Sequence, residues 1–181
     1  MKVEVRLSGS GGQGLILAGI ILAEGAISSK LNAVQTQSYG PEARGGASKS
    51  EVIISDSEIN FPKILKPKIL LSLTQKSLNE YLKDVDKSGI IVVDSSIEVE
   101  CREIANIYKF PIIDSSKEVM GSSVAANMVA LGVLSQLIDD IDTENIKKSM
   151  IKRVPKGTEK LNIAAFEKGI ELFNMSIHAN H

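Results

Sequence analysis

The stretch Leu7-Ser8-Gly9-Ser10-Gly11-Gly12-Gln13-Gly14 joins a short apolar segment to a long one, and it decides the fold class. Before it, residues 2–7 alternate between charged and aliphatic side chains, which predicts a half-buried strand. After it, residues 15–27 are almost entirely Leu, Ile, Ala and Gly, which predicts a helix buried on most sides. A strand, a glycine turn and a helix in this order predict an α/β fold.

The glycines of this stretch offer a candidate anion site. Gly9, Gly11 and Gly14 have the G-x-G-x-x-G spacing, which lets a ligand approach the backbone, while the N–H groups at the start of the helix favour an anion. The alternative is that the glycines only allow close packing of helix and strand. A dinucleotide site needs an acidic residue about 20 positions later, but residues 34–37 read Val-Gln-Thr-Gln. No Gly-Lys-Ser/Thr follows either, so a P-loop is excluded and an anion cradle remains.

Length and composition exclude several classes of protein. The chain has 181 residues, which predicts one domain, and its net charge is −1 with 4% aromatic residues and no Trp, which argues against a nucleic-acid partner. One cysteine, Cys101, excludes an internal disulfide and a Cys-ligated iron–sulfur cluster held by this chain alone. Both histidines, His178 and His181, lie in the terminal segment, so no catalytic or metal-binding residue is predicted. Without a signal peptide or a membrane-spanning run, we expect a cytoplasmic protein.

The order of the remaining segments predicts the architecture. We expect strands at residues 32–39, 48–55, 69–73, 90–94 and 110–114, and helices at 74–85, 102–108, 122–138, 143–152 and 158–173. This alternation predicts a single-domain, Rossmann-like layer fold with a mainly parallel sheet flanked by helices. The two strands around residues 39–55 are expected to form an antiparallel excursion. The domain is expected to span residues 1–174, followed by a tail at 175–181.

Three polar residues outside the glycine stretch are further candidates. Asp94 and Asp114 each end a predicted strand, at the edge where α/β sheets bind ligands. We favour the alternative that both carboxylates satisfy backbone N–H groups in turns or helix caps. Asn127 lies within an apolar helix, where its amide can satisfy a neighbouring backbone group or specify a subunit contact.

A second motif accompanies the glycine stretch. Residues 38–46 read Ser-Tyr-Gly-Pro-Glu-Ala-Arg-Gly-Gly, and this loop is far more specific than the glycine turn alone. Together the two motifs resemble the gamma subunit of the 2-oxoacid:ferredoxin (or flavodoxin) oxidoreductases, and the 2-oxoglutarate type in particular. The resemblance extends over almost the whole chain.

The resemblance implies a division of labour between subunits. Enzymes of this family decarboxylate a 2-oxoacid and form an acyl-CoA, here 2-oxoglutarate to succinyl-CoA and CO2, and pass electrons to ferredoxin or flavodoxin. Thiamine diphosphate, Mg and the iron–sulfur clusters are expected in partner subunits: thiamine-binding alpha and beta subunits and a ferredoxin-like delta subunit. The isolated gamma-type chain is therefore expected to be inactive.

The same resemblance directs the anion cradle towards coenzyme A. The candidate contacts to CoA phosphates are Gly9, Ser10, Gly11, Gly12, Gln13, Gly14 and Arg44. Arg44 offers a planar set of donors suited to phosphate, and Lys49 can add charge. Arg44 can instead pair with Glu42 or with a neighbouring subunit. Two other hypotheses stay open: a stand-alone Rossmann-type nucleotide-binding protein and a purely structural scaffold subunit.

Overall fold

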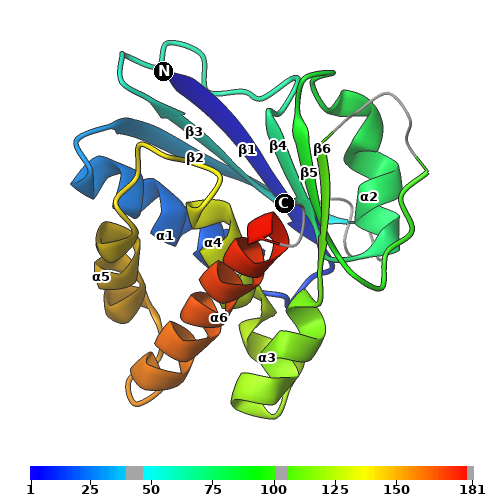
Figure 1. The fold of residues 1–181 in the computed structure, drawn as a ribbon. Helices are drawn as coiled ribbons and strands as arrows, with labels where there is room; N and C mark the ends of the chain where they lie inside the picture. The colour runs from blue at the N-terminus through cyan, green and yellow to red at the C-terminus, as the bar shows by residue number, and fades with distance from the viewer. Residues whose placement is uncertain (40–46, 101–105, 179–181) are drawn as a thin grey trace.

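A six-stranded sheet runs through the molecule and separates two unequal helical layers (Figure 1). The computed structural model describes residues 1–39, 47–100 and 106–178. Within them the strands are β1 (Lys2–Gly9), β2 (Asn32–Tyr39), β3 (Ser48–Ser55), β4 (Ile69–Ser72), β5 (Ile90–Asp94) and β6 (Asn106–Phe110). Their order across the sheet is β2-β3-β1-β4-β5-β6. Strands β1, β4, β5 and β6 are parallel, and β3 is antiparallel to both β1 and β2.

Most helices cover one face of the sheet. That layer holds α1 (Leu15–Ser28), α3 (Ile112–Met120), α4 (Ala126–Ser135), α5 (Thr143–Arg153) and α6 (Glu159–His178), with a short 3-10 turn, η3 (Ser123–Ala125), before α4. The other face is covered by α2 (Gln75–Tyr81) and its 3-10 extension η2 (Leu82–Asp84). The predicted mainly parallel α/β layer fold with an antiparallel excursion is thus confirmed.

The side chains of β1 alternate between the two layers. Val5 and Leu7 face the large core around α1 and α4, and both are fully buried. Arg6 lies on the α2 side and is 2% exposed. The sequence predicts a half-buried strand here, but β1 is central, so helices cover both of its faces.

One part of the predicted element order is wrong. The helix expected over residues 102–108 and the strand expected over 110–114 are replaced by β6 at 106–110 and α3 at 112–120. Residues 106–110 pair in parallel with β5, and Phe110 is buried while Asn106 is exposed. Pairing to a neighbouring strand therefore overrides the helical pattern of this short segment. Residues 101–105, with Cys101, lie outside the described residues.

Two helix boundaries also differ from the expectation. Neither Ser122 nor Ser123 caps α4; instead the Ser116 hydroxyl of α3 accepts a hydrogen bond from the N–H of Ala125 at 3.1 Å. Helix α6 continues through His178, whereas the sequence predicts that this helix ends at residue 173. Across the described ranges no helix combines the length and apolar character needed to cross a bilayer.

Candidate functional site: the glycine turn

The glycine turn follows the carboxyl end of β1 and ends at the N-cap of α1. Gly14 is that N-cap and has left-handed backbone angles, φ 70° and ψ 19°. Its carbonyl accepts hydrogen bonds from the N–H of Ala18 at 3.1 Å and from Nδ2 of Asn127 at 3.0 Å. A Cβ added at Gly14 would lie under 3.0 Å from that Nδ2 atom. Both the backbone angles and the close amide therefore require glycine at this position.

The glycine turn and the first turn of α1 contain backbone N–H groups that form no hydrogen bond with any other described residue. Helix α1 has no side-chain cap and no acidic residue in its first turn. Within the described part of the chain, the N–H groups of Leu15, Ile16 and Leu17 form no hydrogen bond, and neither do those of Gly11 and Gly12. Such free donors at the positive end of a helix dipole are suited to an anion.

Gln13 shapes the turn from within. Its Oε1 atom accepts a hydrogen bond from the N–H of Ser10 at 2.8 Å, and its own N–H reaches the carbonyl of Ser10 at 3.4 Å. A Cβ at Gly9 would lie under 3.0 Å from the same Oε1 atom, so Gly9 makes room for the Gln13 side chain. The N–H of Ser10 is thus satisfied internally, which leaves Gly11 and Gly12 as the free donors of the loop itself.

A cavity of about 520 Å³ lies over this turn. It is lined by the continuous stretch from Ser10 to Leu17, by Ile20 and by Ser48. Backbone donors from the turn thus share the cavity with the aliphatic side chains of α1. Such a mixture suits an anionic ligand that also carries apolar groups.

Both described ends of the Arg44 loop lie beside this cavity. Ser48 begins β3, pairs with Gly9 on one side and with Tyr39 on the other, and lines the cavity itself. The sheet register therefore places the two described ends of that loop, Tyr39 and Ser48, at the same edge of the sheet as Gly9. Glu42 and Arg44 lie outside the described residues, so the predicted contacts of Arg44 stay a prediction.

Lys49 belongs to a different environment. It does not line the cavity; its Nζ atom lies 3.5 Å from Oε1 of Glu51 and 5.6 Å from the ring centre of Tyr81. The Tyr81 hydroxyl donates to the carbonyl of Ala47 at 3.3 Å, and burial raises the pKa of this hydroxyl above its usual range. The expected contribution of Lys49 to an anion site thus has no support in the described geometry.

The cap or turn role favoured for the two aspartates is confirmed for Asp94 but not for Asp114. Asp94 accepts hydrogen bonds from the N–H of Ser96 at 3.0 Å and from the N–H of Ile113, in the first turn of α3, at 2.9 Å. Asp114 lies within α3 and pairs with Lys117 at 2.9 Å on the surface. Asp94 is therefore a turn and helix cap, and the described contacts of Asp114 are those of a surface ion pair.

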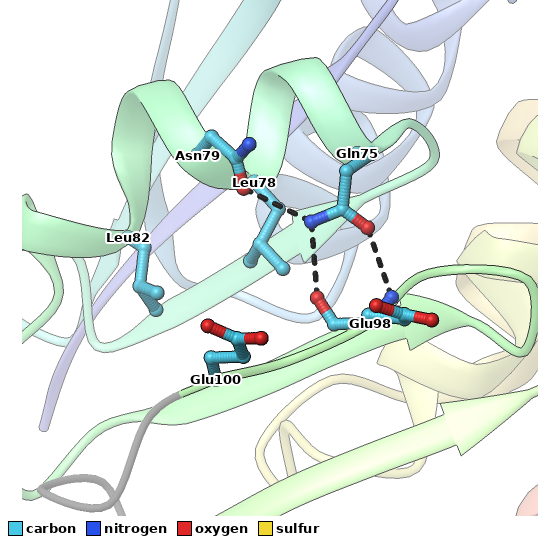
Figure 2. A pocket seen from close by; sticks show the side chains of 6 residues that line it. All are labelled: Gln75, Leu78, Asn79, Leu82, Glu98 and Glu100. Carbon is cyan, nitrogen blue, oxygen red and sulfur yellow. Dashed lines mark hydrogen bonds between the residues drawn. The ribbon is translucent and has the colours of Figure 1, made fainter.

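A second cavity, also about 520 Å³, lies between α2 and the chain after β5 (Figure 2). It is lined by Gln75, Leu78, Asn79, Leu82, Glu98 and Glu100. The Gln75 amide donates to the carbonyl of Glu98 at 3.0 Å and accepts from its N–H at 2.9 Å, as a neighbouring strand would. Gln75 also donates to Asn79 at 2.9 Å. These contacts give the amide a structural role, which is to hold residues 97–100 against α2.

The sheet order bears on the dinucleotide hypothesis. In a dinucleotide-binding fold the second strand is parallel to the first and brings an acidic residue to the ribose. Here the antiparallel strand β3 separates β2 from β1, so β2 runs in the same direction as β1 but lies at the edge of the sheet and is not adjacent to it. No residue of β2 is acidic. Both the topology and the residues thus disfavour a dinucleotide at the glycine turn.

Comparison with known proteins identifies the family. Residues 4–172 match the family model for pyruvate ferredoxin/flavodoxin oxidoreductase. The 2-oxoglutarate synthase subunit KorC of Methanocaldococcus jannaschii is 46% identical over 180 residues, which cover 95% of this chain and 94% of that protein. The gamma subunit of a keto/oxoacid ferredoxin oxidoreductase from Geobacter sulfurreducens has a TM-score of 0.84 and 41% identity, covering 97% of this chain and 98% of the other.

A more distant solved structure shares the fold. The 2-oxoglutarate:ferredoxin oxidoreductase of Magnetococcus marinus, with 2-oxoglutarate, coenzyme A and succinyl-CoA bound, has a TM-score of 0.84 at 22% identity. The matched part covers 96% of this chain and 31% of that one, so the same fold occurs there as one part of a longer polypeptide. From the family match and the extended identity to its relatives, the chain belongs to the pyruvate ferredoxin/flavodoxin oxidoreductase family.

Proposed function

We propose that this chain is the gamma-type subunit of a multi-subunit 2-oxoglutarate:acceptor oxidoreductase. The complex converts 2-oxoglutarate and CoA to succinyl-CoA and CO2 and passes two electrons to ferredoxin or flavodoxin. The substrate assignment is supported by the relative named 2-oxoglutarate synthase subunit KorC, which is 46% identical and matches over 95% of this chain.

The redox and carbanion chemistry is assigned to partner subunits. Thiamine diphosphate and Mg belong to the alpha and beta subunits, and iron–sulfur clusters to a ferredoxin-like delta subunit. Two observations support this division. The chain has one cysteine, too few to hold a cluster alone. Residues 1–39, 47–100 and 106–178 contain no group of three or more His, Cys, Asp or Glu side chains placed to hold a metal ion.

Within the complex, the glycine turn binds a phosphate group of CoA. The observation that carries this assignment is the row of N–H groups at Gly11, Gly12 and the first turn of α1 that form no hydrogen bond with any described residue, inside a cavity of about 520 Å³. The pyrophosphate and the 3′-phosphate of CoA are anions of suitable size. Arg44, in the loop that leads to the cavity-lining Ser48, can add a guanidinium donor. The thiol end then extends towards the thiamine site of the partner subunits.

The need for partners is tested by reconstitution. The isolated chain is expected to show no 2-oxoglutarate-dependent reduction of a viologen dye, whereas co-expression with its alpha, beta and delta partners is expected to give CoA-dependent reduction. Acceptor reduction by the isolated chain would refute the subunit assignment. The same measurement with pyruvate and with branched-chain 2-oxoacids checks the substrate.

The CoA site is tested by adding bulk to the turn. Gly12 has φ 82°, and a Cβ there meets no atom within 4 Å, so Gly12→Val places its side chain in open space over the turn. The Michaelis constant for CoA in the assembled complex should rise about tenfold or more, which corresponds to about 1.4 kcal/mol. The Michaelis constant for 2-oxoglutarate should change less than twofold.

Gly157→Val is the matched control for backbone strain. Gly157 has φ 89° and equally open surroundings, but it does not line the cavity. Gly157→Val should therefore cause a similar loss of stability and leave the Michaelis constant for CoA unchanged. If Gly12→Val also leaves that constant and the turnover unchanged in an intact complex, the turn has a packing role and the scaffold hypothesis is correct.

A further inference from the structure

One buried amide stands out in the helix behind the glycine turn. All ten residues of α4 are buried, and the only polar side chains among them are Asn127 and Ser135, each 4% exposed. Asn127 uses both ends of its amide: Nδ2 donates to the carbonyl of Gly14, and Oδ1 accepts from the N–H of Met128, each at 3.0 Å. The first of these bonds joins positions 113 residues apart.

The Asn127 amide donates to the carbonyl oxygen of the N-cap residue, Gly14. A helix start is usually fixed by an N-cap side chain that accepts hydrogen bonds from the N–H groups of the first turn, and such a cap occupies those donors. Gly14 has no side chain to do so, and α1 has no side-chain cap. Asn127 fixes the Gly14 carbonyl instead. The start of α1 is therefore held in place while the N–H groups of its first turn have no partner among residues 1–39, 47–100 and 106–178.

Positions 14 and 127 fit each other closely. A Cβ at Gly14 would come under 3.0 Å from Nδ2 and to 3.0 Å from Cγ of Asn127. The amide thus occupies the space that any larger residue at the N-cap would need. The left-handed conformation of Gly14, with φ 70°, is the one that brings its carbonyl to this amide.

We propose that Asn127 is a positioning residue for coenzyme A, an inference that rests on the proposed function of the turn. It holds Gly14 from the carbonyl side, so that the N–H groups of Gly11, Gly12 and the first turn of α1 keep the geometry that accepts a phosphate. Donors that are ordered before binding lose less entropy on binding and give higher affinity. Asn127 does not line the cavity, so it acts through Gly14.

The experiment compares three variants in the assembled complex. Asn127→Asp keeps the shape and removes the donor, and Asn127→Leu replaces the amide by an apolar side chain of similar size. Ser135→Ala is the control, since the Ser135 hydroxyl donates to the carbonyl of Gly132 at 2.7 Å in the same buried helix. For each variant the dissociation constant and Michaelis constant for CoA, the turnover at saturating CoA and the thermal midpoint are measured.

Both Asn127 variants should raise the dissociation constant and the Michaelis constant for CoA about five- to tenfold, because each loses one buried hydrogen bond. The turnover and the Michaelis constant for 2-oxoglutarate should stay within twofold of the parent. Ser135→Ala should lower the thermal midpoint and leave the CoA constants unchanged. If Asn127→Leu assembles with unchanged CoA constants, or shifts them no more than Ser135→Ala does, the inference is wrong. If Gly12→Val still weakens CoA in that case, the proposed function stands without it.

Discussion

Gly132→Ala is expected to lower the free energy of unfolding by about 3 kcal/mol, at the upper end for an overpacked core. Helices α4 and α6 cross with their backbones in contact: a Cβ at Gly132 would lie under 3.0 Å from the carbonyl oxygen of Phe166 and 3.0 Å from Cα of Gly169. A Cβ at Gly169 would meet the carbonyl oxygen of Val129 in the same way. These obstacles are backbone atoms within helices, which cannot rotate aside.

The better helix propensity of alanine, about 1 kcal/mol over glycine, does not compensate. Thermal unfolding should show a midpoint lower by about 6–12 °C, from about 2–4 °C per kcal/mol for a domain of this size. Gly19→Ala is the matched control: Gly19 is also helical and buried, but its nearest obstacle is the Ser50 hydroxyl, which can change rotamer. A loss for Gly132→Ala no larger than that for Gly19→Ala would show that the crossing can relax.

Local patterns are sufficient to predict the glycine turn but not what surrounds it. The alternation of residues 2–7 and the apolar run 15–27 predict β1 and α1, since each pattern reflects contacts along one element. The partner of Gly14, Asn127, lies 113 residues away, and only the packing of α4 brings them together. From the sequence, this amide either satisfies a neighbouring backbone group or specifies a subunit contact. The structure shows the first kind of bond, to the Gly14 carbonyl, a partner that no local pattern indicates.

The relation between the two sequence motifs shows the same limit. From the sequence, only the family resemblance links the two motifs, because a helix and a strand separate residues 9–14 from residues 38–46. The register of β3 brings the described end of the second motif next to the first, since Ser48 pairs with Gly9. Strand order is a long-range property, and it also determines that both faces of β1 are covered.

Because of this strand order, the Arg6 side chain is buried and forms ion pairs inside the protein. The alternating pattern treats Arg6 as a residue on the open face of a half-buried strand, but the side chain is 2% exposed. Its guanidinium donates to Glu51 at 2.7 Å, to Asp84 at 2.8 Å and to the carbonyl of Ile64 at 3.1 Å. It also lies 5.2 Å from the ring centre of Tyr81. One residue thus joins β1 to β3, to η2 and to the segment before β4.

Arg6→Met is expected to lower the free energy of unfolding by about 3 kcal/mol, the lower end for breaking a buried ion pair. The variant keeps most of the buried volume but leaves the carbonyl of Ile64 without its donor and Glu51, 9% exposed, without its main cation. Lys49 stays 3.5 Å from Glu51, which limits the loss. Urea unfolding of the purified chain measures the change.

The double variant Arg6→Met/Glu51→Met separates the two causes of this loss. If the unpaired Glu51 carboxylate is the main cost, the double variant is more stable than Arg6→Met alone, because only the partly exposed Asp84 carboxylate is then left without Arg6. If the lost packing and the Ile64 carbonyl dominate, the second substitution adds a further loss. Arg153→Met, which breaks the exposed pair with Glu24, is the control and should leave the urea midpoint nearly unchanged. A small effect of Arg6→Met, equal to that of Arg153→Met, would mean that water reaches the α2 side of β1.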